Sequence, residues 1–334
     1  MDLVKKIDLG KDFVISKLFG IKKPLIVTYS VTGRCNSKCK YCGIRDNINK
    51  EGFSHEEAMA LIGEMGKLGT KKLVFTGGEP LLRDDIGTLI SKAGNLGISV
   101  SLNSNGILLP QKIEDVKNVD FLVLSLDGPK EVNNDLRGNG SYEKVMESLD
   151  IAKEYGINVG LTTVLTKKNV DKLDFLFDIA RDKDVSLNFQ PFVEHISPTM
   201  NKEIKIPNEE LKLNRDELNG VIEKVKEFKM EYDNLIRPSI NTLEKILDIH
   251  FSSIKPNCGK GIIHYRIERR YLIQCPRVWE SEKIPMENGF QRALEKISKN
   301  PSCSGKCCTS ALELFNIWNF DLKTIINQIV NDSF

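Results

Sequence analysis

A regular alternation of short apolar runs with amphipathic helical stretches most constrains the fold of this chain. Six runs rich in β-branched and aromatic residues predict β-strands. They span residues 25–31, 72–77, 98–104, 121–127, 158–165 and 185–190. Helix signals lie between them, because Ser54 followed by Glu57 fits a capping box and Gly156 fits a helix C-terminus. Strands that alternate with helices pair in parallel through right-handed crossovers, so the sequence predicts an α/β fold.

The predicted parallel sheet is expected to curve into part of a barrel. Parallel strands this apolar are usually covered on both faces, and their regular spacing favours a partial (β/α)6 barrel of the TIM type over a small open sheet. Residues 24–235 are assigned to this barrel and to a charged, solvated connecting helix. Residues 1–23 are expected to pack across the barrel bottom, with an amphipathic membrane-surface helix as the alternative, and residues 236–334 are expected to form a separate domain. Functional residues of such barrels lie at the C-terminal ends of the strands.

Composition and charge exclude several classes of function. The 334 residues include 48 basic and 46 acidic side chains, a formal net charge of +2, which is too balanced for the electrostatic footprint of nucleic-acid binding. The N-terminal residues have no unbroken apolar stretch of signal-peptide or membrane-spanning length, because Lys17 interrupts the best candidate. We therefore expect a soluble, cytoplasmic protein with no nucleic-acid partner and no transmembrane segment.

Three of the 8 cysteines lie close together just after the first predicted strand, in the stretch CNSKCKYC. Clustered cysteines in a reducing compartment indicate metal binding or redox chemistry rather than structural disulfides. A structural zinc site takes four ligands, whereas Cys35, Cys39 and Cys42 supply three. Zinc would therefore need Cys308 or His55 as a fourth ligand. An iron-sulfur cubane with three protein thiolates has one iron open to another ligand, and this is the favoured interpretation.

Further motifs follow in order along the later predicted strands. They are TGGEP (76–80), SLNSNG (101–106), LSLDGP (124–129) and TTVLTKKN (162–169). Each alone is an ordinary turn signal. In this order, and with the Cys-x3-Cys-x2-Cys spacing, they resemble the radical S-adenosylmethionine (SAM) superfamily over residues 24–192. The resemblance implies a barrel enzyme that uses SAM together with a 4Fe-4S cluster held by Cys35, Cys39 and Cys42.

The same resemblance implies which residues contact SAM. Glu79 is expected to accept a hydrogen bond from the methionine amino group, and Arg137 to pair with the methionine carboxylate. Ser125 and Asp127 are expected to contact the ribose, and Tyr41 to pack near the adenine. The full expected set is Tyr41, Gly77, Gly78, Glu79, Pro80, Asn103, Ser104, Ser125, Asp127, Arg137, Val164 and Asn169.

The remaining five cysteines lie in the C-terminal part of the chain. Cys258 and Cys275 flank a stretch that predicts a β-hairpin, and CSGKC follows at 303–307. This arrangement resembles the Twitch and SPASM extensions of radical SAM enzymes, which carry auxiliary clusters. The resemblance implies one auxiliary 4Fe-4S cluster in residues 236–334, held by Cys258, Cys275, Cys303 and Cys307, with Cys308 as an alternative ligand. A structural zinc site and unrelated buried thiols remain open.

The resemblance implies a reaction but leaves the substrate open. An enzyme of this kind, supplied with electrons by a flavodoxin or ferredoxin, cleaves SAM reductively to a 5'-deoxyadenosyl radical, which abstracts hydrogen from an unactivated C–H bond. Because only 24 residues precede the first predicted strand, we expect a small or lipid-like biosynthetic intermediate as substrate, with net oxidation or new bond formation. Gln190, Glu194 and His195 follow the sixth strand and are candidates for contact with the substrate, although no catalytic acid or base is assigned.

Two alternatives to this function remain. One is a ribosomal peptide maturase that works with a separate leader-binding protein. The other is a non-catalytic iron-sulfur electron-transfer or zinc-binding protein. The GGEP stretch and Arg137 disfavour the second alternative, because a scaffold has no reason to hold a methionine.

Overall fold

The structure is a computed structural model, and it describes residues 3–42, 52–192, 209–251, 261–274 and 282–298. The described strands form one nine-stranded sheet in the order β6-β5-β4-β3-β2-β1-β7-β8-β9. The first six are β1 (Ile26–Thr32), β2 (Lys72–Gly77), β3 (Ser99–Ser104), β4 (Phe121–Ser125), β5 (Val159–Leu165) and β6 (Ser186–Pro191). All neighbouring pairs from β6 to β1 are parallel.

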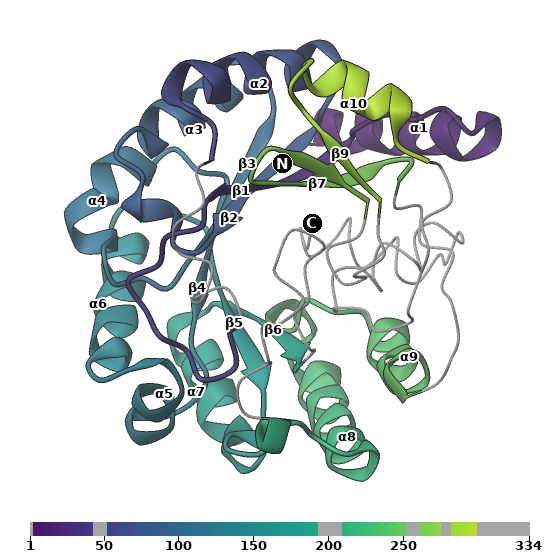
Figure 1. Cartoon of the computed structure of the whole chain (residues 1–334). Coiled ribbons are helices and arrows are strands. Elements are labelled where there is room, and N and C mark those ends of the chain that lie inside the picture. Colours follow the sequence, from purple (N-terminus) through teal and green to yellow (C-terminus); the bar gives the residue numbers. More distant parts are fainter. Residues whose placement is uncertain (1–2, 43–51, 193–208, 252–260, 275–281, 299–334) are drawn as a thin grey trace.

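Helices cover the outside of the curved sheet (Figure 1). They are α2 (His55–Lys67), α3 (Ile86–Asn95), α4 (Leu109–Val116), α5 (Lys130–Arg137), α6 (Ser141–Glu154) and α7 (Leu173–Lys183). The predicted capping box is present at α2, where the Ser54 side chain accepts from the Glu57 backbone N–H and the Glu57 side chain accepts in return. The predicted α/β fold with a parallel, partial barrel is confirmed.

Alternate residues of each strand divide the sheet into two faces. On β1, Val27 and Tyr29 are fully buried in the hydrophobic core between strands and helices. Thr28 and Ser30 point the other way, toward the inner face of the curved sheet, where they contact polar side chains of β7 (His264–Glu268). The core thus holds the helices on the sheet, and the inner face has side chains available for chemistry.

The later strands extend the barrel sheet rather than standing apart from it. Strand β7 pairs in parallel with β1. On its other side it pairs antiparallel with β8 (Tyr271–Ile273), which in turn pairs antiparallel with β9 (Lys283–Pro285). The hairpin predicted between Cys258 and Cys275 is therefore confirmed, although both cysteines lie outside the described residues, as do Cys303, Cys307 and Cys308.

Two contacts of the hairpin region attach it to the outer layer of the barrel. Arg270, in the turn between β7 and β8, forms an ion pair with Glu57 of α2. The backbone N–H groups of Phe290 and Gln291, at the start of α10 (Phe290–Lys296), donate to the Glu64 carboxylate of the same helix α2. Helix α2 therefore contacts both the β7–β8 turn and the start of α10.

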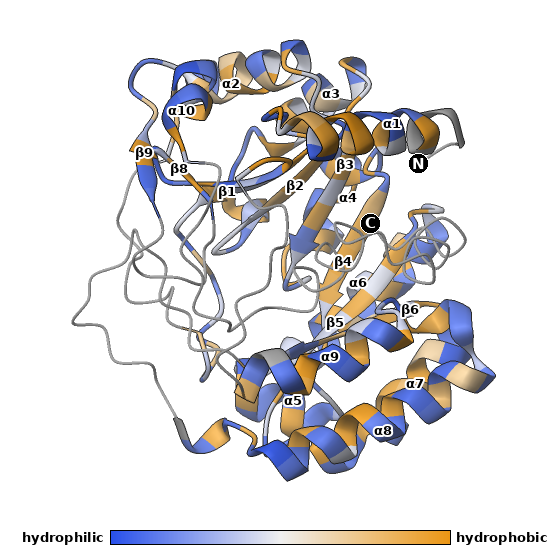
Figure 2. Cartoon of the chain, turned by 90° about the vertical axis from the view of Figure 1, so that its right-hand side faces the viewer, coloured by the Kyte–Doolittle hydropathy of each residue, from blue (hydrophilic) through white to orange (hydrophobic). Residues whose placement is uncertain are grey.

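The charged helix α8 (Arg215–Glu231) differs from the expected solvated connector. It carries hydrophilic and hydrophobic residues along its length (Figure 2), and one face is buried. Leu218, Val221, Ile222 and Val225 belong to the main core, because their i, i+3, i+4 and i+7 spacing aligns them on one side. The helix also pairs with α9 (Ile240–Phe251) and is an integral part of the outer layer.

Helix α1 (Leu3–Phe19) packs beside the N-terminal end of β1. Phe13 is buried against Leu25, Ile26 and Ile263, at the opposite end of the strand from the first three cysteines. Leu18 and Phe19 remain exposed on the outer side of the helix. None of the helices in the described parts of the chain is both long enough and apolar enough to cross a membrane.

Candidate functional site

Residues 33–42 form a loop at the C-terminal end of β1, here called the cysteine loop, which carries the partly exposed thiols of Cys35, Cys39 and Cys42. Cys35 Sγ accepts hydrogen bonds from the Ser37 backbone N–H (3.4 Å) and the Asn105 side-chain amide (3.9 Å). Ser37 Oγ lies 3.3 Å from Cys39 Sγ. Burial raises the pKa of the Cys35 thiol to about 11. Such a thiol is protonated at neutral pH until a bound cation favours its thiolate.

The possible metal ligands of this loop are three cysteine thiols. Within the described ranges, no three Cys, His, Asp or Glu side chains converge as the ligands of a single ion must. Thiolates of an iron-sulfur cluster bind different irons and need no common point. Three cysteine thiols are therefore a donor set of the kind that an iron-sulfur cluster uses.

The start of the cysteine loop is held by the GGEP turn after β2. The backbone N–H of Gly78 donates to the Thr32 carbonyl (2.9 Å), and that of Glu79 to the Arg34 carbonyl (2.8 Å). A Cβ on Gly77 would overlap the Thr32 carbonyl oxygen, and one on Gly78 would overlap that of Arg34. We call Gly77, Gly78 and the Glu79 backbone the glycine clamp. Its glycines admit the cysteine loop itself, because only a residue without Cβ allows this approach.

The Glu79 side chain turns into the protein. It is 1% exposed and accepts hydrogen bonds from the Leu81 N–H (3.1 Å), the Ser104 hydroxyl (2.9 Å) and the Asn105 N–H (2.8 Å). Burial raises the pKa of this carboxyl group. Glu79 thus braces the GGEP turn, which continues into the 3-10 helix η2 (Pro80–Leu82), against the end of β3.

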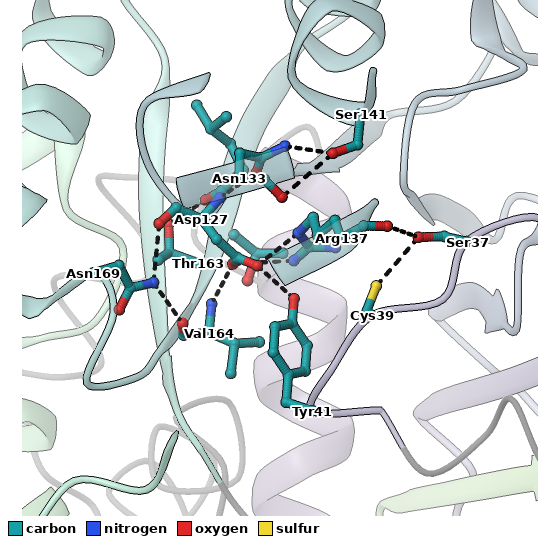
Figure 3. Close-up of polar contacts among 12 residues, drawn as sticks. Ser37, Cys39, Tyr41, Asp127, Asn133, Arg137, Ser141, Thr163, Val164 and Asn169 are labelled. Atoms are coloured by element: carbon teal, nitrogen blue, oxygen red, sulfur yellow. Dashed lines mark hydrogen bonds and ion pairs between the residues drawn. The ribbon is translucent and has the colours of Figure 1, made fainter. Parts of the chain in front are cut away.

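A second set of contacts holds the later part of the cysteine loop (Figure 3). The Tyr41 hydroxyl donates to Asp127 Oδ2 (2.6 Å), on the segment that follows β4. Arg137, the last residue of α5, donates to the same carboxylate from Nε (2.7 Å) and Nη2 (3.1 Å). The backbone N–H of Val164, on β5, completes the set with a bond to Asp127 Oδ1 (2.9 Å).

The C-terminal carbonyls of α5 bind the loop as well. The Lys40 backbone N–H donates to the Leu136 carbonyl (2.8 Å), and the Ser37 hydroxyl donates to the Arg137 carbonyl (2.8 Å). The last carbonyls of a helix have no partner within the helix, so the loop satisfies groups that would otherwise need water. We call the side chains of Ser37, Tyr41, Asp127 and Arg137 the α5 clamp.

The other expected SAM-binding residues divide into two groups. Asn169 and Ser104 are buried and bonded to the protein; the Asn169 amide, for example, donates to the carbonyls of Asp127 and Val164 (both 2.9 Å). Asn103 and Ser125 are partly exposed, and their side chains make no hydrogen bond with any described residue. Of the expected set, these two are therefore the most available to a ligand.

The expected substrate-facing residues are only partly described. Gln190 lies on β6 and is half-buried, whereas Glu194 and His195 lie outside the described residues. Sequence reasoning missed the inner-face residues of β7, where His264 Nε2 lies 3.1 Å from Thr28 Oγ1. The sequence did carry a signal for these residues. In HYRIE (264–268) every second residue is polar, and a strand places alternate residues on one face.

The next two inner-face residues of β7 form a connected pair. Arg266 donates to Glu268 (3.0 Å) and, from Nη2, to the Ser30 hydroxyl (2.8 Å). Both side chains of the Arg266–Glu268 pair are 14% exposed. Because β7 runs parallel to β1, Glu268 lies toward the same end of the sheet as the cysteine loop.

Comparison with known proteins adds the family. Residues 29–179 match the Radical SAM superfamily, a range that includes the cysteine loop, both clamps and strands β2 to β5. The chain contains a radical SAM domain over residues 29–179. The predicted superfamily is confirmed by this domain, and with it the use of SAM and a 4Fe-4S cluster, which is the superfamily's common cofactor set.

Curated relatives of this radical SAM chain match its barrel half. It is 32% identical over 171 residues to the Fe-coproporphyrin III synthase of Methanosarcina barkeri, covering 49% of this chain and 42% of the relative. It is also 32% identical over 178 residues to the GTP 3',8-cyclase of Limosilactobacillus fermentum, covering 50% and 54%. The chain thus spans about half the length of these relatives. Both names denote enzymes, in agreement with the prediction of an enzyme.

Solved structures resemble nearly the whole chain in fold. Native anSMEcpe with bound AdoMet covers 91% of this chain and 99% of its own, with a TM-score of 0.63 and 17% identity. Streptococcus suis SuiB bound to precursor peptide SuiA covers 92% and 68%, with a TM-score of 0.62 and 16% identity. At this identity the likeness concerns the fold alone.

Proposed function

We propose that this chain is a radical SAM enzyme that acts on a small biosynthetic intermediate and produces a net oxidation or a new bond. The carrying observation is the cysteine loop, whose three thiols lie at the C-terminal end of β1 between two clamps. In this proposal Cys35, Cys39 and Cys42 hold the cluster, and SAM binds beside it. When bound, these groups supply a one-electron reductive cleavage and a carbon radical that abstracts hydrogen from an unactivated C–H bond.

The chain's own residues bind, orient and shield the reactants. Asn103 and Ser125 offer an amide and a hydroxyl on partly exposed side chains, which suits the hydroxyl groups of a nucleoside. The clamps keep the thiols in a fixed arrangement, since radical chemistry requires the reacting atoms to be close and aligned.

The inner face of β7 supports a polar substrate over a lipid-like one. Arg266 Nη1 makes no hydrogen bond with the described residues, and a guanidinium presents five donors in all. His264 and Glu268 add polar groups on the same face of the strand. We infer that a polar or anionic part of the substrate contacts this face of β7.

The relatives support a small molecule. The names Fe-coproporphyrin III synthase and GTP 3',8-cyclase both refer to small molecules, and these relatives share about a third of their aligned residues with this chain. The precursor peptide SuiA is bound by SuiB, a protein that is only 16% identical to this chain. The closer sequences thus favour a metabolite over a precursor peptide.

An auxiliary cluster is part of the proposal. We infer that residues 236–334 hold one 4Fe-4S cluster through Cys258, Cys275, Cys303 and Cys307, with Cys308 as the alternative. Support comes from the β7–β8 hairpin and from fold similarity to anSMEcpe that covers 91% of the chain. A flavodoxin or ferredoxin would supply the electron, and a cluster near the substrate could accept one in return.

The test compares two sets of cysteine variants after anaerobic reconstitution. Wild-type protein is expected to hold about eight irons, from the stoichiometry of two cubanes. Replacing Cys35, Cys39 and Cys42 by Ala should abolish 5'-deoxyadenosine formation. Replacing Cys258 and Cys275 by Ala should leave some SAM cleavage and abolish substrate turnover. Release of 5'-deoxyadenosine by the triple variant would remove the proposed cofactor site.

A second experiment addresses the substrate. Reduced enzyme is incubated with SAM and deuterated metabolite extracts, and deuterium in 5'-deoxyadenosine is measured. Label that arrives with a metabolite fraction supports the proposal. Label that arrives only with a precursor peptide would replace it by peptide maturation. Intact clusters without any SAM cleavage would favour an electron-transfer protein.

A further inference from the structure

We propose that Asp127 positions the cysteine loop and that the Tyr41 hydroxyl is the side-chain contact through which it does so. This differs from a direct role of Asp127 on the ribose of SAM. The inference rests on the proposed function in one respect, namely that the loop binds a cluster. The contacts themselves are made between residues of the chain.

The first step is the saturation of the Asp127 carboxylate. Its Oδ2 accepts from the Tyr41 hydroxyl and Arg137 Nε, and its Oδ1 accepts from Arg137 Nη2 and the Val164 N–H. A carboxylate offers about four lone-pair sites, so these four donors use its capacity. Asp127 is also fully buried. A ribose hydroxyl could bind Asp127 only by displacing a donor that is already in place.

The second step is the position of Tyr41 in the chain. It lies between Cys39 and Cys42, and its bond to Asp127 joins this part of the loop to a residue 86 positions later. At 2.6 Å, with a carboxylate oxygen as acceptor, it belongs to the short, strong class of hydrogen bonds. Arg137 also lies over the Tyr41 ring, with 5.6 Å between the guanidinium carbon and the ring centroid. The ring and the hydroxyl are therefore both fixed by the same ion pair.

The third step is what else the carboxylate holds. Through Arg137 it is joined to the C-terminus of α5, whose carbonyls bind Lys40 and Ser37. Through the Val164 N–H it is joined to β5. One buried group therefore ties the cysteine loop to two elements of the barrel. Asn103 and Ser125 remain available to bind the ribose, so binding of the ribose does not require Asp127.

The proposal can be tested in metal-free protein by amide hydrogen exchange. Tyr41→Phe removes one hydroxyl and keeps the ring, and Tyr155→Phe is the matched control on the surface, at 46% exposure. Exchange at the Lys40 amide should accelerate about tenfold or more in Tyr41→Phe, given the strength of a hydrogen bond to a charged acceptor, and stay unchanged in the control. Ser37→Ala, which removes another contact of the α5 clamp, should accelerate it by a smaller factor. Equal exchange in Tyr41→Phe and Tyr155→Phe overturns the proposal.

Reconstituted protein separates positioning from direct binding. Tyr41→Phe should lose its cluster to a chelator several-fold faster than the control, and change the electron paramagnetic resonance signal of the reduced cluster. The affinity for S-adenosylhomocysteine, measured per loaded cluster, should stay within about twofold of the wild type. A tenfold loss of that affinity at full loading makes the residue a ligand and overturns positioning. Failure of wild-type protein to bind iron refutes the proposed function but leaves the exchange experiment valid.

Discussion

The cysteine loop is held at its start and near its end by contacts of different kinds. The glycine clamp uses backbone N–H groups that donate to the carbonyls of Thr32 and Arg34, and it depends on the absence of side chains at Gly77 and Gly78. No charge is involved. The close approach of the two backbones requires that positions 77 and 78 have no side chain. A substitution that adds a Cβ there should therefore displace the cysteine loop completely rather than weaken it by degrees.

The α5 clamp is built from side chains and from a buried ion pair. Tyr41, Arg137 and Ser37 each contribute a separate contact, and the Lys40 backbone N–H adds one that any residue could make. Its members can therefore be removed one at a time. The comparison teaches that one substitution in the glycine clamp should displace the whole cysteine loop. Substitutions in the α5 clamp should instead weaken its attachment one contact at a time.

The largest effect is expected from Gly78→Ala. Its methyl group would overlap the Arg34 carbonyl oxygen and lie 2.6 Å from the carbonyl carbon, so the cysteine loop must leave its position. We expect the loss of about four irons per chain and of SAM cleavage. Gly63→Ala in α2 is the matched control, since nothing lies within 4 Å of its Cβ. Iron analysis and 5'-deoxyadenosine release measure both variants, and a Gly78→Ala enzyme with full activity would contradict the steric account.

The next effect is on the stability of the metal-free protein. Arg137→Met leaves the Asp127 carboxylate buried without its cation, and breaking a buried pair costs about 3–5 kcal/mol. The double variant Asp127→Asn with Arg137→Met should recover part of this free energy of unfolding, because no charge is then buried. Urea denaturation gives the values. Arg181→Met, in the exposed pair with Asp178, should behave like the wild type. If the double variant is less stable than Arg137→Met, the α5 clamp is not held by charge.

Local sequence patterns were enough to predict the strands and the order of the motifs. Runs of β-branched residues place six strands within two residues of their observed bounds, because each strand is buried on the helix-facing side. The three clustered cysteines and GGEP could also be found from the sequence, because each is a short contiguous motif.

The clamps could not be predicted, because they join segments far apart in the chain. The partner of Tyr41 is 86 residues away, and the glycines of GGEP meet a loop more than 40 residues earlier. No spacing rule connects such positions. The buried face of α8 was missed for a different reason: its charged residues outnumber the apolar stripe that the i, i+3, i+4 spacing creates.

A pH experiment asks whether the cysteine loop is already buried before any cluster binds. The raised pKa of Cys35, about 11 against an ordinary value of 9.0, means that the folded state holds its proton more tightly than the unfolded state. This contribution is complete below pH 9 and is lost as the pH rises through 11. It is worth about 3 kcal/mol at most, by the free-energy equivalent of two pKa units. Urea denaturation of metal-free wild type and Cys35→Ala at about pH 7 and about pH 10.5 should give a larger decrease for the wild type. Equal decreases would mean that the loop is open without its cluster.

The smallest effect is expected from a charge at the edge of the α5 clamp. The Lys40 ammonium pairs with Asp135 at the surface, with side chains 41% and 37% exposed, while the Lys40 backbone N–H makes the bond to α5. An exposed pair contributes about 0.5 kcal/mol, so Lys40→Met should retain its cluster against a chelator almost as well as the wild type. High salt should have equally little effect, because it screens this pair and not the buried one. If Lys40→Met instead loses its cluster as fast as Tyr41→Phe, the later part of the loop is held by surface charge, and the buried carboxylate of Asp127 is not its anchor.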